Sequence, residues 1–268
     1  MARVRTLKDI ETLDDYDFLD LGAGDGKSMV SFSDKIGGRG LGIELRRFKV
    51  EKAQELGRDV VLGNALQLDK LPGKVDYVVC DNFLEHLPNK KAVTNVLKKA
   101  TAVTKKFIYI SHPSFEDVDY LKAKGLKTYW SDWSGHTSML TLSDIVEIFH
   151  ECGIHWVQIF PVYHIKTSAD ARILPLDAGL DQFEYEPKHG PKPNPAIRFD
   201  RDVYYAYDIV GLMPGANADL PIMKHANRLR QQNHPKIVVP TPPSAVQRFK
   251  TQSKRVAGKI KRILMTPQ

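Results

Sequence analysis

The chain contains little cysteine and no long apolar run. Its two cysteines, Cys80 in a predicted buried strand and Cys152 near a predicted helix end, provide neither a disulfide framework nor a zinc-ligand pattern. No apolar stretch reaches the ~18 residues that a membrane-spanning helix requires, and no signal-peptide pattern opens the sequence. Because 42% of the 268 residues are hydrophobic and 26% are charged, we expect a globular protein of the reducing cytoplasm.

Acidic residues are missing from the C-terminal part of the sequence. From residue 221 onward there are 11 Lys or Arg and no Asp or Glu, whereas the whole chain carries a net charge of +7. The preceding residues therefore have a net charge of −4, and the basic character belongs to the tail. We predict a catalytic domain over residues 1–213, followed at 214–268 by a Pro-containing basic linker and an amphipathic helix at Ser244–Leu264.

A glycine-rich turn follows a short apolar run near the N-terminus. Tyr16–Leu19 predicts a buried strand that leads into Asp20–Gly26 (DLGAGDG), and a helix is predicted to begin near Lys27. Three glycines in five positions let the backbone bend sharply and approach a ligand, because no Cβ intervenes. A second apolar strand, Gly40–Ile43, ends in Glu44, which is placed to accept hydrogen bonds from both hydroxyls of a ribose.

The details of the turn separate two cofactor classes. Dinucleotide-binding proteins need a third glycine where this chain has Lys27, and the carboxylates of Asp20 and Asp25 would repel a pyrophosphate. The two carboxylates suit a ligand that carries an ammonium and a sulfonium. At these residues the chain resembles the class I S-adenosylmethionine-dependent methyltransferases, along roughly residues 16–165 and up to 213 at most. The resemblance implies S-adenosylmethionine as the cofactor.

The resemblance also places cofactor-binding residues after the third and fourth predicted strands. Asn64 stands where the family usually has an acidic residue, and its side-chain oxygen is expected to accept a hydrogen bond from the adenine amino group. Phe83 follows the fourth strand and either flanks the cofactor or packs on the sheet. The expected cofactor-binding residues are Asp20, Gly22, Gly24, Gly26, Glu44, Asn64, Ala65, Asp81 and Phe83.

Strands and helices continue to alternate along the chain. Further elements are predicted as strands at Asp59–Leu62, Val75–Asp81, Lys106–Ile110, Ile154–Ile165 and Tyr204–Leu212, and as helices at Asn89–Thr101 and from Thr141 or Ser143 to Cys152. This alternation predicts an α/β fold, a mostly parallel sheet with helices on both faces. The resemblance implies a Rossmann-like seven-stranded sheet in the order 3-2-1-4-5-7-6, with the last strand antiparallel. Insertions at 113–139 and 166–202 lengthen the acceptor side, and little regular structure is expected in the proline-containing second insertion.

The loop Tyr129–His136 concentrates chemistry on the acceptor side. It contains two tryptophans, a tyrosine, an aspartate and a histidine, and aromatic faces stack on sugar rings and stabilise a nearby sulfonium. His136 is the first candidate for a general base, with Asp132 as the residue that orients it, and His112 is the second candidate. The alternative is a hydrophobic latch in which His136 makes a structural hydrogen bond. No spacing among the acidic and histidine residues resembles a metal-ligand motif, so no metal site is predicted.

These features favour a methyltransferase that modifies an oxygen of a sugar, a glycolipid-like molecule or another small-molecule acceptor. Two alternatives stay open: an RNA methyltransferase whose tail contacts phosphates, and a non-catalytic binding protein that kept the fold. The basic helix at 244–268 suits an anionic membrane surface at the cytoplasmic side, and it also suits docking on its own domain or on nucleic acid. Neither the acceptor nor the oligomeric state follows from the sequence.

Overall fold

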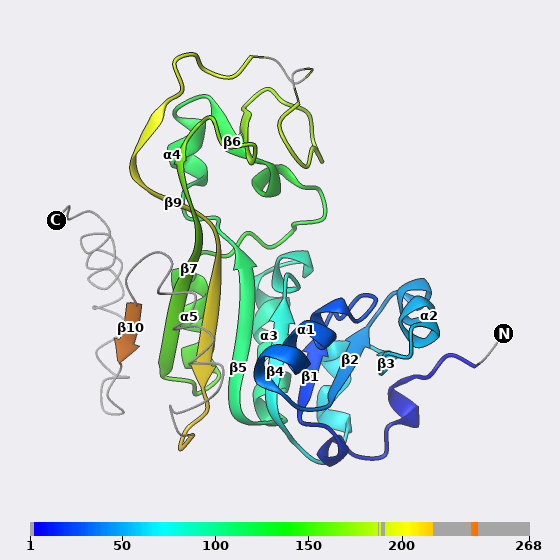
Figure 1. The fold of residues 1–268 in the computed structure, drawn as a ribbon. Helices are drawn as coiled ribbons and strands as arrows, with labels where there is room; N and C mark the ends of the chain where they lie inside the picture. Colours follow the sequence, from blue (N-terminus) through cyan, green and yellow to red (C-terminus); the bar gives the residue numbers. More distant parts are fainter. Residues whose placement is uncertain (1–2, 187, 189–190, 217–236, 241–268) are drawn as a thin grey trace.

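The computed structural model describes residues 3–186, 188, 191–216 and 237–240. Within these residues the main sheet has eight strands in the order β10-β7-β9-β5-β4-β1-β2-β3 (Figure 1). The strands are β1 (Phe18–Leu21), β2 (Gly40–Glu44), β3 (Val60–Leu62), β4 (Val75–Asp81), β5 (Thr104–Pro113), β7 (Trp156–Thr167), β9 (Arg198–Leu212) and β10 (Ile237–Pro240). Strands β1 to β5 run parallel, and β9 is antiparallel to both of its neighbours. The predicted order and the predicted antiparallel last strand are confirmed.

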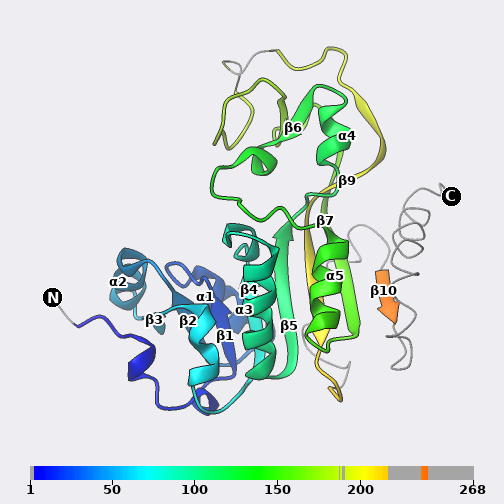
Figure 2. The same ribbon diagram turned by 180° about the vertical axis from the view of Figure 1, so that it is seen from behind.

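Helices cover both faces of the sheet, as the alternation of elements predicted. The helices are α1 (Lys27–Ile36), α2 (Arg47–Glu55), α3 (Lys90–Ala102), α4 (Val118–Lys122) and α5 (Leu142–Glu151), with short 3₁₀ helices at η1 (Leu7–Asp9), η2 (Leu13–Asp15), η3 (Ala65–Lys70), η4 (Leu84–His86) and η5 (Tyr129–Asp132). Successive residues of β4 pack on opposite faces of the sheet. Val79 packs in one core cluster with Met29 of α1, and Cys80 packs in another with Leu97 of α3. Figures 1 and 2 show α1 on one side of the sheet and α3 and α5 on the other. Burial on both faces explains why the parallel strands read as continuous apolar runs.

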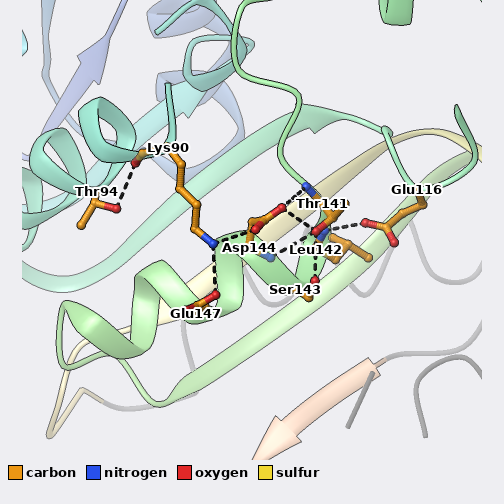
Figure 3. Close-up of polar contacts among 8 residues, drawn as sticks. All are labelled: Lys90, Thr94, Glu116, Thr141, Leu142, Ser143, Asp144 and Glu147. Carbon is orange, nitrogen blue, oxygen red and sulfur yellow. Dashed lines mark hydrogen bonds and ion pairs between the residues drawn. The ribbon is translucent and has the colours of Figure 1, made fainter. Parts of the chain in front are cut away.

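A polar contact ties α3 to α5 and fixes where α5 begins. Of the two predicted N-terminal caps, the structure uses Thr141, whose hydroxyl and backbone form a capping box with Asp144. The Nζ atom of Lys90 on α3 donates to Asp144 (2.7 Å) and to Glu147 (3.0 Å), so one ammonium bridges the two helices (Figure 3). The carboxyl of Glu116 accepts the first backbone N–H of α5, and partial desolvation there raises its pKa. The loop that precedes α5 is therefore anchored at its end.

The two insertions form a small subdomain, here called the cap (residues 113–139 and 166–202). Strand β6 (Leu126–Thr128) pairs antiparallel with β8 (Ile173–Pro175), and a separate apolar cluster that includes Leu121, Trp130 and Val203 fills its interior. The cap lies beyond the end of β5 and beside the extended ends of β7 and β9 (Figure 1). The second insertion thus holds more regular structure than expected. Strand β9 begins at Arg198, ahead of the predicted start at Tyr204, because its first residues pair with β7 and pack into the cap.

Strand β10 also departs from the expectation. The sequence analysis placed residues 237–240 in a linker, yet they pair antiparallel with β7, with Ile237 opposite Ile159 and Pro240 opposite Trp156. Proline lacks an N–H, which the outer strand of a sheet tolerates. The predicted helix at Ser244–Leu264 lies outside the described residues. None of the helices within the described part of the chain has the length and apolarity to cross a membrane.

Candidate functional site

The glycine turn connects β1 to α1 at the carboxyl end of the parallel strands. Gly22, Gly24 and Gly26 have φ angles of +74°, +58° and +80°, which residues with a side chain rarely adopt. At Gly22 the space is closed as well, because a Cβ added there would lie 2.5 Å from Cδ2 of Phe83. Phe83 also packs against the apolar core on the α3 side. Phe83 therefore packs on the sheet and also borders the turn, so its predicted place beside the cofactor stays a prediction.

Glu44 lies at the carboxyl end of β2 and closes one side of the turn. Only 6% of the residue is exposed. Its Oε2 accepts the backbone N–H of Gly24 at 3.0 Å, and its Oε1 accepts that of Arg46 at 2.8 Å. Each carboxylate oxygen accepts one N–H and keeps a second acceptor position, so Glu44 fits the role of binding both hydroxyls of a ribose. Leu45 and Phe48 expose an apolar surface beside it, 69% and 64% exposed, of the kind that a purine ring covers.

The two aspartates of the turn do not present their charges to a ligand as expected. Asp20 is 1% exposed, burial raises its pKa to about 8, and the hydroxyl of Ser28 donates to it. Asp25 is compensated by neighbouring cations, with Lys52 at 3.4 Å, Arg58 at 3.6 Å and Lys27 at 3.9 Å. Asp20 thus supports the turn from inside, and the carboxylate beside the ligand position is that of Glu44.

The remaining expected cofactor residues follow β3 and β4. Asn64 is exposed, and its Oδ1 accepts the N–H of Leu66 at 2.9 Å as the N-terminal cap of η3, while Ala65 is buried beneath it. That oxygen retains one acceptor position for an adenine amino group. Asp81 ends β4, where Asn82 donates to it at 3.1 Å and burial raises its pKa. Strands β1, β2, β3 and β4 therefore bring all the expected cofactor residues to one edge of the sheet.

Three imidazoles and one carboxylate gather from η4, β5 and the cap. We call Glu85, His86, His112 and His136 the imidazole cluster. A carboxylate oxygen of Glu85 and one ring nitrogen each of His86 and His136 lie within 4.8 Å of one another. Glu85 and His112 are 1% and 2% exposed, with Oε2 and Nδ1 3.4 Å apart, and their side-chain atoms have no hydrogen-bond partner among the described residues. The cluster is thus partly buried and polar at the acceptor side of the sheet.

Carbonyl groups of the cap orient the imidazoles of His136 and His86. Nδ1 of His136 lies 2.7 Å from the carbonyl oxygen of Trp130, and Nδ1 of His86 lies 2.9 Å from that of Gly135. A carbonyl accepts only, so each Nδ1 carries the proton and each Nε2 carries a lone pair. Burial lowers the pKa of His136. The imidazole of His136 is therefore neutral at pH 7, with a basic nitrogen available.

The predicted partners of His136 are placed differently. Asp132 forms an ion pair with Lys127, whose ammonium is buried and also contacts the carbonyl of Ala178. The orienting role expected of Asp132 thus belongs to the Trp130 carbonyl, because a buried ammonium needs the carboxylate as its counter-ion. His112 is 2% exposed and its Nδ1 lies 3.4 Å from Oε2 of Glu85, so an acceptor would not reach its ring. Sequence reasoning did not group Glu85 and His86 with His136, although an acid and a histidine directly after a parallel strand were a visible signal.

The aromatic loop serves two purposes. Trp130 is 1% exposed and its Nε1 donates to the carbonyl of Ser114 at 2.6 Å, so it holds the cap together. Trp133 is half-buried, and its ring centroid lies 6.5 Å from that of His136 and 6.4 Å from that of the exposed Phe183. Trp130 therefore holds this loop against the cap, as the structural alternative of the sequence analysis expected. Trp133 and Phe183 instead form an aromatic rim beside the imidazole cluster.

Comparison with known proteins gives one family match and several solved structures of similar fold. Residues 18–106 match the family model described as a methyltransferase domain, and no curated protein matches the chain. A SAM-dependent methyltransferase from Archaeoglobus fulgidus superposes with a TM-score of 0.53 and 18% identity over 73% of this chain and 85% of its own. The YcgJ protein from Bacillus subtilis (TM-score 0.49, 17% identity) covers 76% of this chain and 94% of its own. Magnesium protoporphyrin IX methyltransferase from Synechocystis, solved with bound SAM (TM-score 0.42, 14% identity), covers 74% and 69%.

The family match and the site geometry coincide. Residues 18–106 run from β1 into β5 and include the glycine turn, Glu44, Asn64, Asp81 and Phe83. The Archaeoglobus structure has the same fold. The three turn glycines have positive φ angles, and Glu44 has the acceptor positions that a ribose requires. Residues 18–106 form a methyltransferase domain within a Rossmann-like methyltransferase fold, and S-adenosylmethionine is its cofactor.

Proposed function

We propose that the enzyme methylates a hydroxyl oxygen of a small-molecule acceptor, of the sugar or glycolipid-like class. The observation that carries this proposal is the position of the imidazole cluster. Glu85 and His86 follow Phe83 by two and three residues, and Phe83 contacts Gly22 of the cofactor turn. This segment carries Glu85 and His86, which lie next to the proposed base His136 of the cap, and a base beside the methyl donor is what hydroxyl methylation needs.

The residues of the site divide the work of an in-line displacement. S-adenosylmethionine supplies the methyl group, which its sulfonium already activates. The cofactor is held by the glycine turn and Glu44, and Phe83 limits its freedom on the acceptor side. Nε2 of His136 accepts the hydroxyl proton, because its Nδ1–H is fixed on the Trp130 carbonyl. The nearby Glu85 carboxylate favours the imidazolium that results.

The acceptor class is argued from the aromatic rim. Trp133 and the exposed Phe183 offer ring faces on which the apolar face of a sugar ring packs. A polar ring with one hydroxyl aimed at His136 matches this combination of an apolar rim and a neutral base.

We also infer that the basic tail holds the enzyme at an anionic membrane surface on the cytoplasmic side. The support is the sequence of residues 244–268, where basic residues flank an apolar stripe that includes Phe249, Ile260 and Leu264. Each Lys or Arg near such a surface contributes ~1 kcal/mol. Co-sedimentation of the full chain with phosphatidylserine vesicles tests this. Charge reversal at Lys259, Lys261 and Arg262 should release the protein, and unchanged sedimentation would contradict the inference.

The acceptor class is tested by methyl transfer from radiolabelled S-adenosylmethionine into an extract of the host. Label should appear in the carbohydrate or lipid fraction with the parent enzyme and disappear with Gly22→Ala, which destroys the cofactor turn. Label in the RNA or protein fraction instead would overturn the acceptor class and leave the methyltransferase activity standing.

A further inference from the structure

We propose that Glu85, His86 and His136 form a binding site for a divalent first-row transition-metal ion on the acceptor side of the enzyme. One ligand atom from each residue lies within 4.8 Å of the other two. Ligands of a four-coordinate ion at 2.0–2.2 Å stand roughly 3.3–3.6 Å apart, so rotamer adjustments of about an ångström complete the site. Two imidazoles and one carboxylate suit zinc, cobalt or iron, whereas magnesium and calcium prefer oxygen ligands throughout.

The two imidazoles are already oriented as metal ligands. Their Nδ1 atoms lie against the carbonyl oxygens of Trp130 and Gly135, at 2.7 and 2.9 Å. A second hydrogen bond of this kind fixes the ring and the tautomer of a metal-binding histidine. Both Nε2 lone pairs are thus presented for coordination, and both anchoring carbonyls come from the loop that carries His136 itself.

The independent observation is the carboxylate of Glu85. It is 1% exposed, and neither of its oxygens has a hydrogen-bond partner among the described residues. A buried carboxylate without partners is costly unless a cation compensates it. The basic side chain nearest to it is the imidazole of His112, 3.4 Å away, which is itself without a hydrogen bond in that part of the chain. A bound cation would satisfy Glu85, and His112 would then stand behind it as an outer partner.

Three protein ligands leave at least one coordination position open. This consequence rests on the proposed function: an acceptor hydroxyl that binds there has its pKa lowered by the cation. His136 is then a ligand, and the hydroxyl proton leaves an already activated oxygen to solvent. Without the ion, His136 is the base. If the metal-bound enzyme is the active one, a chelator should slow methyl transfer; if the metal-free enzyme is, it should not. Binding of the ion itself can be measured without turnover.

The test is a titration of untagged full-length protein with Co²⁺, followed by its visible absorption. The expected result is one ion per chain and a d–d band typical of low coordination number. His86→Ala and His136→Ala should each weaken binding by at least ~10-fold, whereas His155→Ala, a histidine outside the cluster, should leave the affinity unchanged. Binding of S-adenosylhomocysteine to each variant verifies that the cofactor half remains folded.

Replacing the carboxylate provides a second variant that is close in shape. Glu85→Gln should also weaken Co²⁺ binding by at least ~10-fold while retaining S-adenosylhomocysteine. Two results would overturn the metal site. One is no stoichiometric binding below about 1 mM Co²⁺, a concentration on the order at which weak surface sites bind. The other is Co²⁺ binding that all three cluster variants retain. Methyl transfer to a hydroxyl that persists in that case would leave the proposed function intact, so the two failures are distinguishable.

Discussion

The ring of Phe83 lies against Gly22 so closely that a methyl group on Gly22 would fall 2.5 Å from the ring carbon Cδ2. This contact joins the first turn of the cofactor site to the segment after β4. Glu85 and His86 follow Phe83 by two and three residues, so the same contact links the glycine turn to the imidazole cluster. In the proposed function, the contact between Gly22 and Phe83 is where the cofactor turn meets the catalytic segment.

The first prediction concerns Gly22→Ala. The substitution combines a strained φ of +74° with a clash against Phe83, and we expect S-adenosylhomocysteine binding to weaken by more than ~100-fold, measured by equilibrium dialysis. Gly57→Ala is the matched control, since Gly57 has a φ of +69° but no atom within 4 Å of an added Cβ. The control should lower the melting temperature and keep the affinity. Equal affinity losses in both variants would mean that strain alone, without Phe83, explains the effect.

The second prediction concerns Glu44→Gln. An amide has a single acceptor oxygen, which cannot serve the Gly24 N–H, the Arg46 N–H and two ribose hydroxyls together. Hydrogen bonds to a charged group contribute about 1.5–3 kcal/mol each, so affinity for S-adenosylmethionine should fall ~10- to 100-fold. Glu51→Gln on α2 should have no effect. Affinity within twofold of the parent would remove Glu44 from ribose binding.

The third prediction concerns His136 as base in the metal-free enzyme. Because burial lowers its pKa, the neutral imidazole persists below pH 6.5, and the acidic limb of the pH–rate profile should lie below that value. His136→Ala should reduce turnover by ~10²–10⁴ with unchanged affinity for the cofactor. The measurement is the rate of methyl transfer to the labelled acceptor in the presence of a chelator, with His155→Ala as the control. A profile whose acidic limb is retained in His136→Ala would assign the base elsewhere.

The fourth prediction is a pH dependence of stability that comes from Asp20. Its pKa is about 8 in the folded protein and near 4 when unfolded, so the folded state binds the proton more tightly. The free energy of unfolding should therefore fall as pH rises toward 8. Asp208, with a pKa of about 6, adds to this fall mainly below pH 6.

Between pH 6 and 8 the free energy of unfolding should fall mainly because of Asp20, with a limiting slope of ~1.4 kcal/mol per pH unit. Asp20→Asn should flatten the curve, because its amide keeps the hydrogen bond from Ser28 and does not titrate. Asp34→Asn, an exposed change on α1, should not alter the slope. Urea titrations at each pH give the comparison, and parallel curves for all three proteins would show that Asp20 does not carry the dependence.

The parallel strands could be predicted because each is an apolar run that ends at a helix signal, whereas their order in the sheet came from the family resemblance. Strand β10 could not, since its pairing with β7 depends on a partner some eighty residues away in a proline-bounded segment. The same holds for β6 and β8, three residues each, which pair across more than forty residues of chain. Short strands carry too little periodicity to be read without knowing what they pack against.

The parts of the site carried by one sequence motif could be predicted, and the parts assembled from several segments could not. The glycine turn and Glu44 follow from their spacing. The assignment of Asp132 to His136 failed because Lys127, five residues earlier, is buried and takes the carboxylate. His86 and His136 were not paired because they come from η4 and the cap, and only the fold places their ring centroids 5.1 Å apart.

The most direct test of the central claim is a crystal structure of the full-length enzyme with S-adenosylhomocysteine. We predict that both ribose hydroxyls lie within hydrogen-bonding distance of the Glu44 carboxylate. The sulfur should lie over the glycine turn on the side of Phe83 that leads to His136. A ribose bound away from Glu44, or a sulfur that faces away from the imidazole cluster, would contradict the account.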